Sequence, residues 1–214
     1  MNNMKKCLYL LGLTTLSASA VTTISVSNLD TTDTSDSAIF DSEGNVIQIG
    51  EGSIQVGYFD TFTTSEDFSG STSSSLLDDF VAFGSTTSAF DNSFNVDGFF
   101  SADFIDTINT GDVIIGQTLF TVIGNNNTLS NSTDFLVFRH DGTEFAEEVA
   151  GIGAASGVVR VGSGTLLLGT NTGDTIVNGF AVGSFTQIAL PVPEPSSTLL
   201  IGLAGIGMTL RRRR

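Results

Sequence analysis

The residues best suited to chemistry are His140 and Asp141, which stand side by side near the end of the run FLVFRHDG. A histidine oriented by a carboxylate can act as a general base for a serine nucleophile. However, the chain has one histidine, and no Gly-x-Ser-x-Gly elbow accompanies it. We therefore predict that His140 lies in a surface turn and is not a catalytic base.

Pairs of adjacent carboxylates could serve a glycosidase, which needs two carboxyl groups facing each other across a cleft. Three such pairs occur: Glu66/Asp67, Asp78/Asp79 and Glu147/Glu148. Adjacent residues of a strand point to opposite faces, and an acidic chain contains such pairs by chance. The preferred interpretation is a solvated surface.

Two groups of oxygen donors could bind calcium, which prefers carboxylate and carbonyl ligands. They are Asp30-x-x-Asp33-x-x-Asp36 and Asp41-Ser-Glu43-Gly-Asn45. Neither has the spacing of a calcium-binding loop or its closing glutamate. We predict no cofactor and leave a weak Ca²⁺ site as the alternative.

Two further motifs are interpreted as loops. Gly151, Gly153 and Gly157 resemble a dinucleotide fingerprint with one residue too many and no βαβ context. Asn126-Asn127-Thr128 and Asn131-Ser132-Thr133 satisfy the glycosylation sequon. They predict an exposed loop tip.

The elements that must position these residues are mostly strands. Short runs rich in Val, Ile, Phe and Thr, bounded by turn residues, recur between Val21 and Leu190. This pattern predicts an all-β fold, an antiparallel β-sandwich-like single domain. One exception is SSSLLDDFVAFG, whose near-helical apolar spacing predicts one short helix at about residues 75–83.

Composition excludes several partners. The chain has 23 acidic and 8 basic residues, and between Val21 and Leu190 the basic residues are Arg139 and Arg160 alone. A surface this acidic repels phosphate backbones and anionic lipid. With 17 Phe, the domain at 21–190 has enough apolar residues to form a core. We expect no nucleic-acid partner.

The N-terminal residues 1–20 have the organisation of a secretory signal peptide. Lys5 and Lys6 precede an apolar run, and Ala18-Ser19-Ala20 gives the small-x-small pattern of a cleavage site before Val21. We therefore expect export through the Sec translocon and removal of residues 1–20 by signal peptidase.

The C-terminal segment 191–214 combines three features in order. Prolines at 191, 193 and 195 form a stiff linker; an apolar, glycine-containing run follows at 198–210, and Arg211, Arg212, Arg213 and Arg214 end the segment. As a helix the run spans about 20 Å, which is short for a hydrocarbon core of about 30 Å. The arginines mark a cytoplasmic side, so the segment suits transient anchoring and supplies the expected membrane contact.

The order Pro193-Glu194-Pro195, apolar run and arginine cluster resembles the PEP-CTERM sorting signal of exported bacterial proteins. The resemblance implies that an exosortase recognises Pro193, Glu194 and Pro195. It also implies a membrane segment at 198–210, retention by Arg211 to Arg214, and cleavage of the tail. Such proteins typically come from Gram-negative bacteria that make exopolysaccharide, and are linked to the cell surface or biofilm matrix.

These observations lead to a non-enzymatic exported protein with a structural or adhesive role. Inner-membrane anchoring is expected to be transient, followed by residence at the cell surface, with exopolysaccharide as a partner. A calcium-assisted carbohydrate-binding module is the alternative, and an enzyme ranks third. Against sugar binding, the domain has no Trp and, apart from Tyr58, no Tyr to stack on a sugar ring.

Overall fold

The structure is a computed structural model that describes residues 21–29, 37–88, 90–92, 95–109, 111–146, 154–160, 162–177 and 180–192. Strands make up about half of these residues and far outnumber the short helices, which confirms the all-β prediction. The elements are β1 (Val21–Ser27), β2 (Ser37–Phe40), β3 (Ser53–Phe59), α1 (Ser65–Ser69), α2 (Ser73–Asp79), β4 (Phe80–Ser88), β5 (Ser101–Thr107), β6 (Thr118–Gly124), η1 (Leu129–Asn131), β7 (Asp134–Glu144), β8 (Ala154–Val158), β9 (Thr165–Leu168), β10 (Thr170–Asn171), β11 (Thr175–Val177), β12 (Phe180–Thr186) and β13 (Ile188–Ala189).

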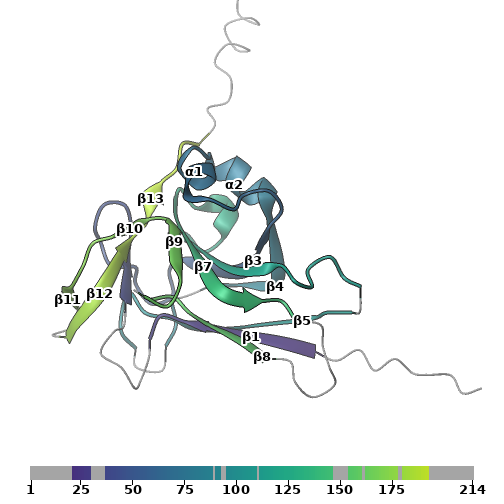
Figure 1. Ribbon diagram of the computed structural model, residues 1–214. Coiled ribbons are helices and arrows are strands. Elements are labelled where there is room, and N and C mark those ends of the chain that lie inside the picture. Colours follow the sequence, from purple (N-terminus) through teal and green to yellow (C-terminus); the bar gives the residue numbers. More distant parts are fainter. Residues whose placement is uncertain are drawn as a thin grey trace, which may run out of the picture.

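A six-stranded antiparallel sheet forms the centre of the domain (Figure 1). Its order is β13-β7-β6-β3-β4, and β9 also pairs with β7. Alternation along the strands divides their side chains between two faces. On β7, for example, Leu136 and Phe138 enter one hydrophobic cluster while Phe135 and Val137 enter another.

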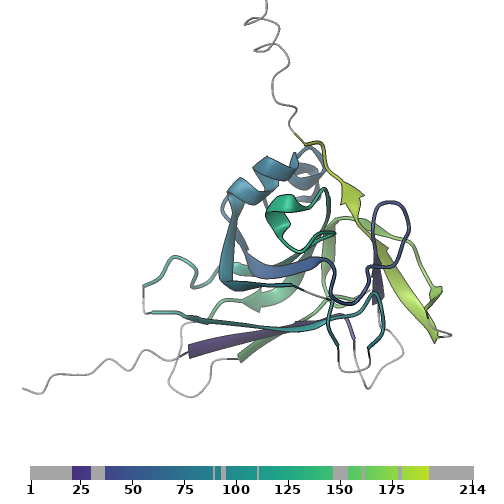
Figure 2. The same ribbon diagram turned by 180° about the vertical axis from the view of Figure 1, so that it is seen from behind.

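One face of this sheet packs on a three-stranded sheet of order β5-β1-β8 (Figures 1 and 2). β1 pairs with β5 in antiparallel and with β8 in parallel orientation. Ile24 and Phe104 of the smaller sheet are buried against Ile54, Val56 and Phe138 of the larger one. We call this interior the sandwich core.

The opposite face is covered by two short helices, α1 and α2, which we call the helical cap (Figure 2). Phe68 of α1 is fully buried, and its ring meets that of Phe59 edge-to-face at 4.9 Å between centroids. Phe59 also meets Phe120 at 5.2 Å. We call this second interior the cap core; Leu76 of α2 is buried in it as well.

The helix predicted at about residues 75–83 is confirmed in its first part. α2 occupies Ser73–Asp79, and Thr72 caps it by accepting a hydrogen bond from the backbone N–H of Ser75. From Phe80 onward the chain is strand β4, because Phe80 and Val81 pair with β3. Strand pairing with an existing sheet outweighs the helical spacing here.

A small third sheet closes one side of the domain. Its order is β10-β12-β11, and β2 pairs with β12 in parallel orientation. Beneath it lies a minor cluster that includes Ala38, Phe99 and Val182. This sheet carries the chain through β12 into β13, the last strand described.

Candidate functional site

His140 is buried, so the predicted surface turn is wrong. The side chain is 3 % exposed, its Nε2 lies 2.8 Å from the Thr121 hydroxyl, and its ring packs edge-to-face on Phe138. Strand β7 continues to Glu144, past the run FLVFRHDG, and alternation directs His140 into the interior. Burial lowers the pKa of His140 to about 4, so the ring is uncharged at neutral pH and is shielded from substrates.

Asp141 lies on the other side of β7 and does not orient His140. Its carboxylate accepts hydrogen bonds from the Thr165 hydroxyl at 2.6 Å and from Nε of Arg139 at 2.7 Å. These two contacts hold the pKa of Asp141 below its usual value. The two neighbours therefore do not form the histidine–carboxylate pair that their sequence suggests.

In each carboxylate pair of the helical cap, the second aspartate accepts hydrogen bonds from backbone N–H groups of a nearby turn. Asp67 accepts from the backbone N–H groups of Thr63 and Thr64, which lowers its pKa. Partial burial acts to raise the pKa of Asp79, but hydrogen bonds from Thr61 and Phe62 outweigh it, so the pKa is lowered. The solvated interpretation is confirmed for Asp67, which is exposed, whereas Asp79 is half-buried. Glu147 and Glu148 lie outside the described residues.

The oxygen donors proposed for calcium are also used within the chain. Asp41 accepts from the backbone N–H groups of Glu43 and Asn45 and so closes its own turn. Asp30, Asp33 and Asp36 lie outside the described residues. In the part of the chain that the structure describes, no three His, Cys, Asp or Glu side chains gather closely enough to hold a metal ion.

The two motifs interpreted as loops have different outcomes. The asparagines of both sequons, Asn126 and Asn131, are exposed as predicted, but Leu129 and Ser132 in the same loop around η1 are buried. Gly157 instead lies in strand β8, where a Cβ would come within 2.5 Å of the His140 ring. Gly151 and Gly153 lie outside the described residues.

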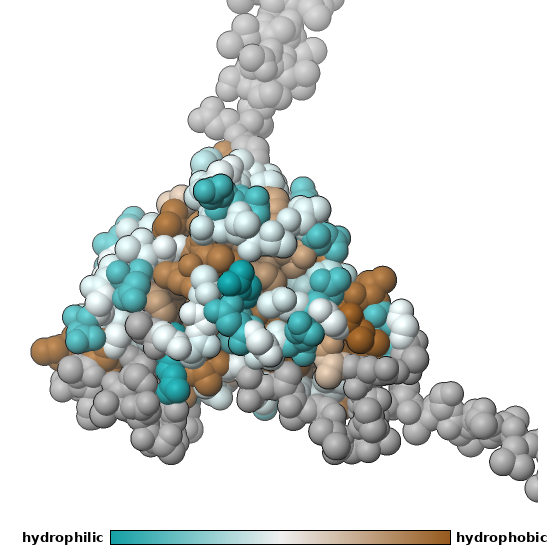
Figure 3. All heavy atoms as spheres, in the orientation of Figure 1, coloured by the Kyte–Doolittle hydropathy of each residue, from teal (hydrophilic) through white to brown (hydrophobic). Residues whose placement is uncertain are grey.

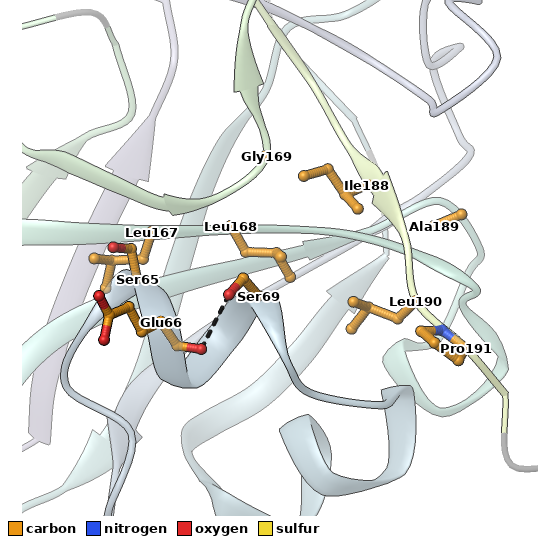
Figure 4. Close-up of a pocket in the computed structure, with 10 residues that line it drawn as sticks. All are labelled: Ser65, Glu66, Ser69, Leu167, Leu168, Gly169, Ile188, Ala189, Leu190 and Pro191. Carbon is orange, nitrogen blue, oxygen red and sulfur yellow. Dashed lines mark hydrogen bonds between the residues drawn. The ribbon is translucent and has the colours of Figure 1, made fainter.

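A hollow of about 370 Å³ lies between α1, the end of β9 and residues 188–191, and we call it the exit groove (Figure 4). Leu168 and Leu190 on its floor belong to the cap core. Hydrophobic side chains gather on this face below the helical cap (Figure 3). The described residues that line the groove are Ser65, Glu66, Ser69, Leu167, Leu168, Gly169, Ile188, Ala189, Leu190 and Pro191.

The chain is fastened to the domain up to the edge of this groove. Strand β13 pairs with the start of β7, and the backbone N–H of Leu190 donates to the Thr133 carbonyl at 2.9 Å. The carbonyl of Pro191 accepts from the backbone N–H of Ser73, the first residue of α2, at 3.4 Å. Val192 alone then separates Pro191 from Pro193.

The described residues form a β-sheet domain whose last described positions, Pro191 and Val192, are exposed at its surface. Residues 191–214 match the family model of the PEP-CTERM protein-sorting motif. The chain therefore carries the sorting signal of an exported protein that a membrane-associated exosortase handles. No curated protein and no solved structure matches the chain.

The match confirms the predicted PEP-CTERM signal over the stretch that the sequence indicated. The separate roles assigned to Pro193, Glu194, Pro195 and the arginine cluster stay predictions, as does cleavage after Ala20. The apolar run at 198–210 lies outside the described residues. Among the residues that the structure does describe, there is no helix with the length and hydropathy of a membrane span.

The sequence did not predict the exit groove. Its floor is formed by the runs TLLLG and QIALP, more than fifteen residues apart, and nothing in their spacing indicates that they meet. The weak signal is that both apolar runs stand next to chain-breaking Gly169 or Pro191.

Proposed function

We propose that this chain is a non-enzymatic passenger protein of the bacterial cell surface. It is exported through the Sec translocon, loses residues 1–20 to signal peptidase, and is held briefly in the inner membrane by residues 198–210. An exosortase then removes the arginine-bearing tail. The processed domain has a structural or adhesive role in the exopolysaccharide matrix of a Gram-negative envelope.

The observation that carries this proposal is the sorting motif, together with the way the domain presents it. The last anchored residue, Pro191, is followed by the exposed Val192, and Pro193 comes next in the sequence. The acidic composition of the domain supports a partner other than nucleic acid or anionic lipid.

Two features of the described residues support a role without catalysis. His140, the one candidate base, is buried and neutral at physiological pH. The carboxylate oxygens of Asp67, Asp79 and Asp141 accept hydrogen bonds from backbone, hydroxyl and guanidinium groups of the domain. Both arrangements serve to hold the structure.

Processing is tested by intact-mass analysis of the exported protein from a strain that contains an exosortase. The expected species begins at Val21 and lacks the arginine tail. Replacing Pro193, Glu194 and Pro195 by alanine should leave an uncut, membrane-bound form. A mature species that still ends in Arg214 would contradict cleavage.

The matrix role is tested by digesting the exopolysaccharide of intact cells. The processed domain should sediment with cells before digestion and appear in the supernatant afterwards. The same sedimentation with and without digestion would contradict attachment to polysaccharide.

A further inference from the structure

We propose that the exit groove is a second recognition surface for the membrane enzyme that reads the sorting motif. In this proposal the enzyme contacts the helical cap and β13 while it holds Pro193-Glu194-Pro195. The inference rests on the proposed function, because it assumes that an exosortase acts on the tail.

The covalent chain limits how far the motif can be from the groove. Consecutive Cα atoms are about 3.8 Å apart, so the Cα of Pro193 lies within about 8 Å of that of Pro191. Pro191 lines the groove, and its carbonyl is held by Ser73. An enzyme whose cleft encloses the three-residue motif must therefore also touch the residues around Pro191.

The surface that the enzyme meets there has two walls (Figure 4). Ile188, Ala189 and Pro191 form the wall next to the tail. Ser65, Glu66 and Ser69 of α1 form the facing wall. Since both walls are attached to the cap core, they form a surface that is in place before the enzyme arrives.

The chemistry of the groove indicates the chemistry of the partner. Leu168 and Leu190 make its floor apolar, and the neighbouring side chains of Ile188 and Val192 are 38 % and 56 % exposed. Glu66 is the charged member of the described lining. The groove thus fits an apolar side chain flanked by a basic group, and its acidic wall disfavours anionic lipid headgroups.

The apolar run at 198–210 is the competing occupant of the groove. To reach the floor it would have to reverse direction soon after Pro191. The sequence Val192-Pro193-Glu194-Pro195 disfavours this reversal, because each proline fixes its own φ and restricts the preceding residue to extended conformations. The sequence therefore favours a separate protein as the occupant.

The test measures the rate of tail removal by pulse-chase in exporting cells that contain the exosortase. Ser69→Trp fills the groove and should slow removal about tenfold or more; Glu66→Lys, which reverses the charge of the wall, should slow it several-fold. The matched controls are Ser101→Trp and Glu51→Lys. Ser101 is the first residue of β5, and Glu51 lies two residues before the start of β3. Both controls should keep the original rate, and thermal melting of the purified domain should show all four variants folded.

The outcomes separate this inference from the proposed function. If alanines at Pro193, Glu194 and Pro195 leave processing intact, the proposed function fails. If they block processing while Ser69→Trp and Glu66→Lys are cut at the original rate, the groove is not a recognition surface. Equal slowing of the two control variants would also overturn the groove proposal. A flexible six-residue spacer inserted after Val192 gives a further test. Faster processing of that variant would overturn the proposal, because the groove would then obstruct the enzyme.

Discussion

The two faces of the six-stranded sheet are built from the same strands but differ in what they bury. The face toward β1 and β5 carries the sandwich core, in which aliphatic and aromatic side chains surround the buried His140–Thr121 pair. The face toward the helices carries the cap core, where Phe59, Phe68 and Phe120 interlock. Only the second face reaches the exit groove, through Leu168 and Leu190.

The difference separates global stability from local presentation. The sandwich core joins two sheets whose strands are distant in sequence, so a defect there affects the whole domain. The cap core fastens two helices of five and seven residues, which are too short to be stable alone. Because Ser73 holds Pro191, a defect there should first loosen the end from which the sorting motif emerges.

The largest effect is expected from the sandwich core. Phe138→Ala should lower the free energy of unfolding by about 3–5 kcal/mol, since a buried phenylalanine is replaced by a cavity. Urea denaturation of the purified domain measures this loss. Phe62→Ala is the control on the opposite face, where the side chain is half-buried, and it should cost clearly less. Equal losses would contradict the expectation that the burial of each ring sets the cost of its removal.

The next effect is the pH dependence that the buried histidine gives to the sandwich core. The pKa of His140 falls from 6.5 to about 4 on burial, so the unfolded chain binds the proton more readily between these values. Stability should therefore be complete above about pH 6.5 and fall by about 3 kcal/mol as pH drops to about 4. Urea unfolding at a series of pH values measures this slope. His140→Gln should remove it, and an unchanged slope in that variant would contradict the assignment.

A smaller and more local effect is expected in the cap core. Leu76→Ala should cost about 2–3 kcal/mol, because this buried side chain holds α2. Hydrogen exchange should speed up in α2 and β13 before it does in β1 and β5. Leu77→Ala, next to it and half-buried, is the matched control with a smaller expected effect. Uniform acceleration over all strands would show that the helical cap does not open separately.

The smallest effect is expected at the turn that leads into α1. Asp79→Asn weakens the hydrogen bonds from Thr61 and Phe62 and should cost about 1 kcal/mol, given the partial exposure of the carboxylate. Asp78→Asn, at an exposed neighbouring position, should leave the thermal midpoint unchanged. A loss in the control as large as in Asp79→Asn would indicate a general charge effect.

Much of the fold could be predicted because strand signals are local. β1 coincides with the alternating run from Val21 to Ser27, and in β3 the apolar residues Ile54, Val56 and Tyr58 recur at every second position. The helix prediction extended too far because helical spacing of apolar residues cannot report that β3 is available to pair with Phe80. The local sequence pattern therefore predicted which elements form better than it predicted the residues at which they begin and end.

The polar interior could not be predicted for the same reason. Asn28 is fully buried and bridges Ser37, Gly98 and Phe100, residues up to seventy-two positions away. His140 appeared to lie in a turn because the end of β7 depends on pairing with β6 and β9. Such partners are brought together only by the packing of sheets.

The sequence by itself determined the sorting signal at 191–214, the all-β class and the acidic character, because each is written in contiguous residues or in composition. The tertiary structure decided that His140 is buried and neutral, and that the motif starts one residue beyond an anchored proline beside an apolar groove. The physical reason is distance along the chain. Burial and grooves arise where strands far apart in sequence pack together, and a linear pattern carries no record of that packing.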